Sequence, residues 1–294
     1  MVQKTDHSIW YILPYIVYAA SIVLVFVPFL IFVSNGWEGS ANDCLEGGDD
    51  NCFCERVDIA KVEAGASGIR QKTNTWSNLY ALITAAIVAF GIARDRKTLG
   101  NGTAPNLIKS RNILADLCIF AVFFLGFGSM WFHASITQWG GKFDGMSMYM
   151  FVGYMVCYTL YRIVPRWWLF VIVYLAIVIV FTGFHNHVDS VILIAINVGF
   201  YFVLEATILI WRLIDWIKGK WRPERDWYIP VIWWIAGLTS FGLAYMFWKW
   251  GVREHSFCNP DSAWQWHGMW HLFAGIMAVF IYFYWRSSRP LKTR

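Results

Sequence analysis

Three histidines, one serine and one aspartate stand near the ends of apolar segments in a strongly hydrophobic chain. Ser129 and His133 lie in GSMWFHAS, Asp144 lies in GKFDGMSMY, and His267 and His271 lie in WQWHGMWHLF. Residues four apart project from one face of a helix, so each spaced pair points in one direction. Three neutral imidazoles that leave one position open are a ligand set for a catalytic zinc, whose bound water ionises near neutral pH. These five residues are therefore the candidate site.

Each of these residues also has an ordinary structural explanation. A lone histidine at a helix end, such as His133, is usually an interfacial side chain. Ser129 could simply bond a carbonyl one turn back, and Asp144 could cap a helix N-terminus. Polar residues at membrane depth are costly, however, and usually mark function. It is the complete ordered set, rather than any single member, that favours a catalytic site.

The composition places the chain in a membrane. Of its 294 residues, 58% are hydrophobic and only 15% are charged, whereas soluble domains carry about a quarter charged residues. Nineteen Trp and fourteen Tyr suit the aromatic belts of the two membrane interfaces. The net charge of +5 arises from Lys and Arg gathered in particular loops, so we expect no nucleic-acid partner.

Eight apolar stretches are long enough to cross a hydrocarbon core, which takes about 20 helical residues. A short turn at Arg162, Pro165 and Arg166 divides the fourth stretch from the fifth. The sequence therefore predicts an all-α polytopic membrane helix bundle. Its eight spans run over approximately 9–33, 76–93, 113–133, 144–163, 167–184, 189–212, 228–249 and 264–285.

The distribution of basic residues predicts the orientation. With the N-terminus inside, 17 of the 24 Lys and Arg residues lie on the inner side and 7 lie outside. The positive-inside rule therefore predicts that both termini are cytoplasmic. In this topology the five site residues, from three helices, reach the outer level of the membrane. The sequence does not distinguish a bacterial inner membrane from the ER, Golgi or plasma membrane.

Four cysteines, Cys44, Cys52, Cys54 and Cys258, lie in loops assigned to the outside, where disulfides persist. Four cysteines allow three pairings, and a Cys-x-Cys metal site is the alternative. Among the pairings we predict Cys54 with Cys258, which would join the segment before the core to the loop before the last helix.

The ordered site residues resemble the alkaline ceramidase family, within the CREST superfamily of seven-helix metal-dependent membrane hydrolases. The resemblance consists of S-x-x-x-H, an Asp eleven residues after that His, and H-x-x-x-H in the last helix. Cys54-Glu55 and the run Asn74-Thr75-Trp76-Ser77-Asn78 also match. Because the resemblance covers about 50–290, it leaves one extra N-terminal transmembrane helix before a seven-helix core. The predicted divisions are that helix (1–33), an external acidic Cys-containing segment (34–75) and a ceramidase-like domain (76–294).

The resemblance implies a role for each site residue. It makes His133, His267 and His271 zinc ligands, Ser129 a partner of the water or the oxyanion, and Asp144 the catalytic proton acceptor. It implies that a membrane lipid, a long-chain N-acyl amide such as ceramide, is hydrolysed to a sphingoid base and a fatty acid by attack of zinc-bound water. The acyl-chain and sphingoid-base preferences are not readable from the sequence.

The resemblance also implies a calcium site in the acidic segment before the core. Glu55 stands at one ligand position, and the nearby Asp58 is a second candidate, since calcium accepts carboxylates in flexible geometry. The chain departs from the family pattern at Cys52, Val57 and Gln71, where other ligands are expected. Solvated acidic loops are the ordinary alternative.

Two other functions stay open at this point. A seven-helix lipid-binding receptor of the progestin and adipoQ type would share the metal ligands, but it lacks the Cys-Glu and Asn-Thr-Trp-Ser-Asn segments and is expected in the opposite orientation. A GPI-processing lipid hydrolase is the third possibility.

Further polar features also call for an explanation. His185, His187 and Asp189 form H-x-H-x-D, which could hold a second metal but is typical of an interfacial turn. Glu205 stands within an apolar stretch and is expected to face the bundle interior. Asp116, near a helix end, is interpreted as structural.

Overall fold

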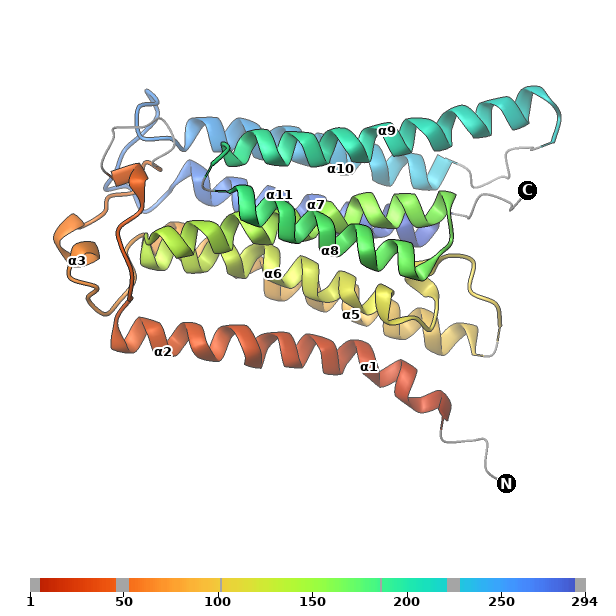
Figure 1. The fold of residues 1–294 in the computed structure, drawn as a ribbon, viewed down its shortest axis with the longest axis horizontal. Coiled ribbons are helices and arrows are strands. Elements are labelled where there is room, and N and C mark those ends of the chain that lie inside the picture. The colour runs from red at the N-terminus through yellow and green to blue at the C-terminus, as the bar shows by residue number, and fades with distance from the viewer. Residues whose placement is uncertain (1–5, 46–52, 101, 186, 221–227, 289–294) are drawn as a thin grey trace.

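The structure of the chain is a computed structural model that describes residues 6–45, 53–100, 102–185, 187–220 and 228–288. Regular structure in these ranges is helical, apart from two isolated bridges. Figure 1 shows the long helices lying side by side as a bundle. The all-α fold class predicted from the sequence is confirmed.

Eight helical rods make up the bundle within the described ranges. The first is α1 (Asp6–Ser21), the π-helical turn η1 (Ile22–Phe26) and α2 (Val27–Asn35). The others are α4 (Lys72–Ser77) with α5 (Tyr80–Leu99), α6 (Ile113–Ser135), α7 (Gln138–Ile163), α8 (Trp167–Phe184), α9 (Ser190–Ile217), α10 (Tyr228–Trp250) and α11 (Trp266–Ser287). The short elements are η2 (Asp43–Leu45), α3 (Ile59–Glu63) and η3 (Leu107–Lys109).

Seven of these rods are long and apolar enough to cross a membrane, in agreement with a multi-pass membrane protein. They are 9–35, 72–99, 113–135, 167–184, 190–217, 228–250 and 266–287. Helix α7, the fourth predicted span, is long enough but too polar to meet the same measure, because it carries Lys142 and Asp144 in its first turns and several tyrosines and Arg162 farther along. It nevertheless lies within the bundle, packed against α6, α8 and α9.

The helices alternate in direction, which gives the bundle two distinct ends. Helices α6, α8 and α10 finish, and α7, α9 and α11 begin, at the end where Figure 1 shows α3. We call this the α3 end. Helix α1 begins at the opposite end, and α11 finishes there too, as an even number of crossings requires.

Buried ion pairs join neighbouring helices toward the opposite end. Arg96 of α5 binds Asp116 of α6 at 2.9 Å, and neither side chain has any exposed surface. Arg162 of α7 binds Glu205 of α9 at 2.9 Å, and Glu205 also accepts from Thr159 and Tyr284. Glu205 therefore faces the interior and Asp116 has a structural partner, as the sequence indicates.

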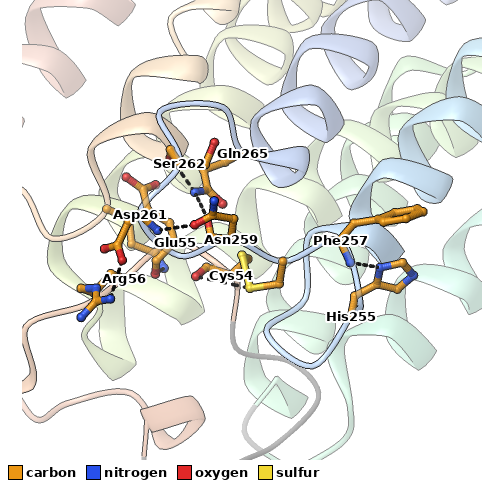
Figure 2. The surroundings of a disulfide bond; sticks show 11 residues. Cys54, Glu55, Arg56, His255, Phe257, Asn259, Asp261, Ser262 and Gln265 are labelled. Carbon is orange, nitrogen blue, oxygen red and sulfur yellow. Dashed lines mark hydrogen bonds and ion pairs between the residues drawn. A yellow bond between two sulfur atoms is a disulfide. The ribbon is translucent and has the colours of Figure 1, made fainter.

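The segment before the core is joined to the loop before α11 by a Cys54–Cys258 disulfide, as predicted. Figure 2 shows the surrounding contacts, which include the Arg56–Asp261 ion pair at 2.5 Å. The Cys54 N–H also donates to the Gly251 carbonyl at 2.8 Å. Cys52 lies outside the described residues.

Candidate active site and metal centre

The five candidate site residues meet at the α3 end because three antiparallel helices end or begin there. Ser129 and His133 belong to the last turns of α6, Asp144 to the early turns of α7, and His267 and His271 to the first turns of α11. All five predicted positions are thus brought together.

A tight connection between α6 and α7 places their polar residues on neighbouring helices. Ile136 caps α6 in the left-handed region at φ 52°, which is unusual for a β-branched residue. Thr137 follows as the N-cap of α7 and accepts from the Gly140 N–H at 3.2 Å. At Gly128 an added Cβ would lie 2.5 Å from the Ser147 side chain, so glycine permits the close approach of the two helices. The approach brings Asp144 and Ser129 to the wall of one cavity.

The three histidines form one compact cluster. Each offers one ring nitrogen such that the three nitrogens all lie within 4.8 Å of one another. The Nε2 atoms of His133 and His267 are 3.1 Å apart. His133 is fully buried, and His267 and His271 are each 2% exposed. Among the described residues this is the one group of three or more potential metal ligands.

Two further side chains orient the histidines from outside the cluster. Gln71 Oε1 lies 2.7 Å from His133 Nδ1, and Ser77 Oγ lies 2.7 Å from His271 Nδ1. The Ser77 hydroxyl donates its one proton to the Asn74 carbonyl at 2.9 Å, so it accepts from the His271 Nδ1–H. These positioning residues were missed in the sequence, where Ser77 is visible only as part of a family motif and Gln71 only as a departure.

His267 differs from the other two histidines. Its Nδ1 is buried without a hydrogen-bond partner within the described structure. The Phe53 ring packs on its imidazole with centroids 3.6 Å apart, and also contacts His133. Packing therefore fixes this ring where the other two are fixed by hydrogen bonds.

An apolar cavity of about 610 Å³ opens beside the cluster. Ser129, Asp144, His267 and His271 line one wall of it. The remaining walls carry aromatic side chains from α9, α10 and α11, among them Phe202, Phe241, Tyr245, Trp248 and Trp270. A cavity of this size with a few convergent polar groups is typical of a small-molecule site. Its apolar lining suits hydrocarbon chains.

The ceramidase family model matches residues 68–292, which is well over half of the chain. The chain belongs to the ceramidase family. Comparison with curated proteins gives no match. The ceramidase match includes all five site residues and begins after α1, α2 and α3, so the predicted divisions at 33/34 and 75/76 stay predictions.

Membership of the ceramidase family supports a ceramide-hydrolysing enzyme that acts on an amide bond in a lipid substrate. The family is metal-dependent, and the three buried histidines could bind a metal ion. Neither the receptor nor the GPI-processing alternative is favoured by this match.

The predicted calcium ligands have other partners in this chain. The two carboxylate oxygens of Glu55 accept from the Thr73 and Asn74 N–H groups, each at 2.8 Å, and so cap α4. Burial raises the pKa of the Glu55 carboxyl. Asp58 caps α3, and the backbone hydrogen bond from Lys61 lowers its pKa. The calcium site stays a prediction, and Asp49 and Asp50, its neighbouring acidic residues, lie outside the described structure.

The residues of the H-x-H-x-D motif do not form a second metal-binding group in the described part of the chain. Asp189 caps α9 by accepting from the Val191 N–H at 2.8 Å, and His187 is exposed. His185, in contrast, lines the cavity.

Proposed function

We propose that this chain is a zinc-dependent intramembrane lipid amidase that hydrolyses ceramide, or a closely related N-acyl lipid, to a long-chain amine and a fatty acid. The observation that carries the proposal is the buried three-histidine cluster on the polar wall of an otherwise apolar cavity. The ceramidase-family match is the reason for proposing an amide bond of a lipid as the substrate.

The three histidines fit zinc in donor type, and the pair with a known nitrogen separation fits it in spacing. Tetrahedral zinc with Zn–N bonds of about 2.0–2.1 Å separates its ligand atoms by about 3.3 Å, close to the 3.1 Å between the Nε2 atoms of His133 and His267. Gln71 accepts from the His133 Nδ1–H, and Ser77 accepts from the His271 Nδ1–H. Both histidines therefore keep the Nε2 lone pair for a metal. When bound, zinc supplies a Lewis acid and an activated water.

The protein groups divide the remaining chemistry. Hydrolysis forms a bond between the water oxygen and the acyl carbon and breaks the carbon–nitrogen bond of the amide. The Asp144 carboxylate accepts the proton that the water loses and returns it to the leaving amine nitrogen. The Ser129 hydroxyl, which lines the same cavity as Asp144 and lies 3.2 Å from His271 Nε2, donates to the developing oxyanion or orients the water.

A graded set of variants tests this proposal. Replacing His133, His267 or His271 by Ala is expected to lower both zinc content and ceramide hydrolysis, because a three-ligand site has no spare ligand. Asp144→Asn is expected to keep zinc and lose about 10²–10⁴-fold in turnover, because it removes the proton acceptor rather than a ligand. Ser129→Ala is expected to keep zinc with a lower kcat.

Each protein is purified in detergent, checked by size exclusion, and measured for bound metal by elemental mass spectrometry and for released fatty acid by chromatography. His187→Ala, which changes an exposed histidine at the same end of the bundle, is the control. The mechanism is wrong if a folded triple-histidine variant hydrolyses ceramide at the wild-type rate. It is equally wrong if Asp144→Asn loses zinc while it stays fully active.

A further inference from the structure

The cavity has a second polar region on the first turns of α7. Gly141 and Gly145 are four residues apart and so lie on one face of α7, with side-chain positions about 5–6 Å apart. At each glycine a polar side chain from another segment comes against the helix backbone. An added Cβ at Gly141 would lie 2.8 Å from Asn42 Nδ2, and one at Gly145 would lie 2.3 Å from the His185 ring.

His185 is held in a defined position on the wall of the cavity that Asp144 also lines. Its ring packs on Gly145, the residue that follows Asp144. Its Nδ1 is 3.0 Å from the hydroxyl of Tyr149, a residue with no exposed surface. Because the Tyr149 contact occupies Nδ1 and His185 lines the cavity, Nε2 is the ring nitrogen left for a ligand.

Asn42 presents a second hydrogen-bonding group in the same region. Its Oδ1 accepts from the Cys44 N–H at 3.1 Å, which leaves the Nδ2 donors available. The backbone around it is anchored, because the Asn42 N–H donates to the Ile136 carbonyl at 3.0 Å. Asn42 also lines the cavity, although it comes from the segment that precedes the family match.

We propose that Asn42 and His185 form a subsite that binds the hydroxyl groups on the amine half of the lipid substrate. The subsite rests on the proposed amidase function, which places the amide between Asp144 and the histidine cluster. Its lining faces the same cavity as Asp144, so an amide held there brings the first carbons of its amine half toward His185. The hydrocarbon chains then lie along the aromatic walls.

The chemistry of the two side chains favours a hydroxyl over an ionised head group. Burial lowers the pKa of His185, and the charge of Lys142 lowers it further, so the ring is neutral near pH 7. A neutral imidazole with Nδ1 engaged offers either one donor or one acceptor at Nε2, and a hydroxyl complements both. Asn42 adds a donor that a hydroxyl oxygen accepts. A phosphorylated head would instead need a cation in contact, and Lys142 is the nearby candidate.

The test compares amides that differ only in hydroxyl groups. Purified full-length protein in detergent is assayed on an N-acyl sphinganine and on the same N-acyl amide of 2-aminooctadecane, which lacks both hydroxyls. Wild type is expected to prefer the hydroxylated amide in kcat/KM. His185→Leu is expected to reduce that preference by about three- to tenfold, the effect of one or two buried neutral hydrogen bonds, because it lowers kcat/KM on the hydroxylated amide more than on the unhydroxylated one. Asn42→Ala is expected to act in the same direction.

Two variants separate recognition from a general structural effect. Gly145→Ala displaces the His185 ring without changing it, and is expected to reduce the preference as His185→Leu does. Gly183→Ala is its matched control, since an added Cβ there meets nothing within 4 Å. His187→Leu, which changes the exposed histidine of the same turn, is the matched control for His185→Leu. Tyr149→Phe frees the His185 ring and is expected to give a smaller loss of preference.

Equal losses on the two amides in the His185 variant would overturn the subsite. So would a wild-type preference for a phosphorylated amide that depends on Lys142. Thermal stabilisation of the protein by each lipid is measured in parallel. If wild type hydrolyses no amide, the proposed function fails, and the subsite is then decided by whether His185→Leu abolishes the extra stabilisation given by the hydroxylated lipid.

Discussion

Gln71 gives the sharpest test of whether the histidine cluster is a metal centre. Its side-chain oxygen lies 2.7 Å from Nδ1 of His133, and the two residues are 2% exposed and fully buried, respectively. Gln71→Leu removes that acceptor and leaves a buried N–H without a partner. The ring is then free to turn or to change tautomer, so its Nε2 lone pair is no longer held toward the other histidines.

The size of the effect follows from two independent considerations. Loss of a residue that orients a metal ligand costs about 10–100-fold in metal affinity, or about 1.4–2.7 kcal/mol. Leaving a buried polar group unpaired costs about 1–3 kcal/mol, which is the same range. We therefore expect the zinc dissociation constant of Gln71→Leu to rise by about 10–100-fold, with a smaller fall in kcat measured at saturating zinc.

The measurement is competition for zinc against a chelator of known affinity, on purified and size-checked protein. Gln71→Glu keeps the acceptor atom but loses the amide donor to the Glu55 carbonyl, which is 2.9 Å away. It is expected to hold zinc close to the wild-type affinity and so to separate histidine orientation from support of Glu55. Gln138→Leu, an exposed glutamine at the same end, is the control. Unchanged zinc affinity in folded Gln71→Leu would refute the orienting role.

Three other predictions concern the scaffold. The double variant Cys54→Ala, Cys258→Ala is expected to lower the free energy of unfolding by about 2–4 kcal/mol. Its thermal midpoint should be lower than that of the wild type and should not change further when reductant is added. A midpoint equal to that of the wild type would contradict this prediction. A cysteine at exposed Lys61 is expected to react with an impermeant thiol reagent in intact cells, and one at exposed Lys97 is not, because basic residues favour an inner location for the opposite end; the reverse pattern would invert the proposed orientation. Glu205→Gln is expected to lower the free energy of unfolding by about 3–5 kcal/mol, since Arg162 would keep a buried charge without its counterion. The zinc content is expected to be unchanged. Loss of zinc in a folded protein would contradict this and show that the two ends of the bundle are coupled.

The helices could be predicted from the sequence because membrane spans depend on local apolar length. The turn between α7 and α8, which was predicted at Arg162, Pro165 and Arg166, is observed between Ile163 and Trp167. The start of α7 was predicted less accurately. It begins at Gln138 rather than near 144, because Thr137 caps a polar first turn that no hydrophobic criterion detects.

The site was predictable where its residues share a helix or follow an ordered motif. The four-residue spacings predict which side chains project together, and the family motif fixes their order. Gln71 and Ser77 could not be assigned in this way, since they are 62 and 194 residues from the histidines that they orient. The packing of the segment at residues 53–77 under α6 and α11 creates these contacts, and no local pattern encodes them.

The two ends of the bundle place their polar groups according to different requirements. Toward the opposite end, charges such as those of Arg96 and Asp116 are fully paired, which makes them compatible with burial between helices. At the α3 end, His267 Nδ1 has no hydrogen-bond partner among the described residues, and Asp144 and His185 line the cavity. Incomplete pairing in a membrane protein costs stability. Part of that cost falls at the α3 end, where a metal ion and a lipid amide would supply the missing partners, so we expect substitutions of these residues to alter ligand binding more than folding.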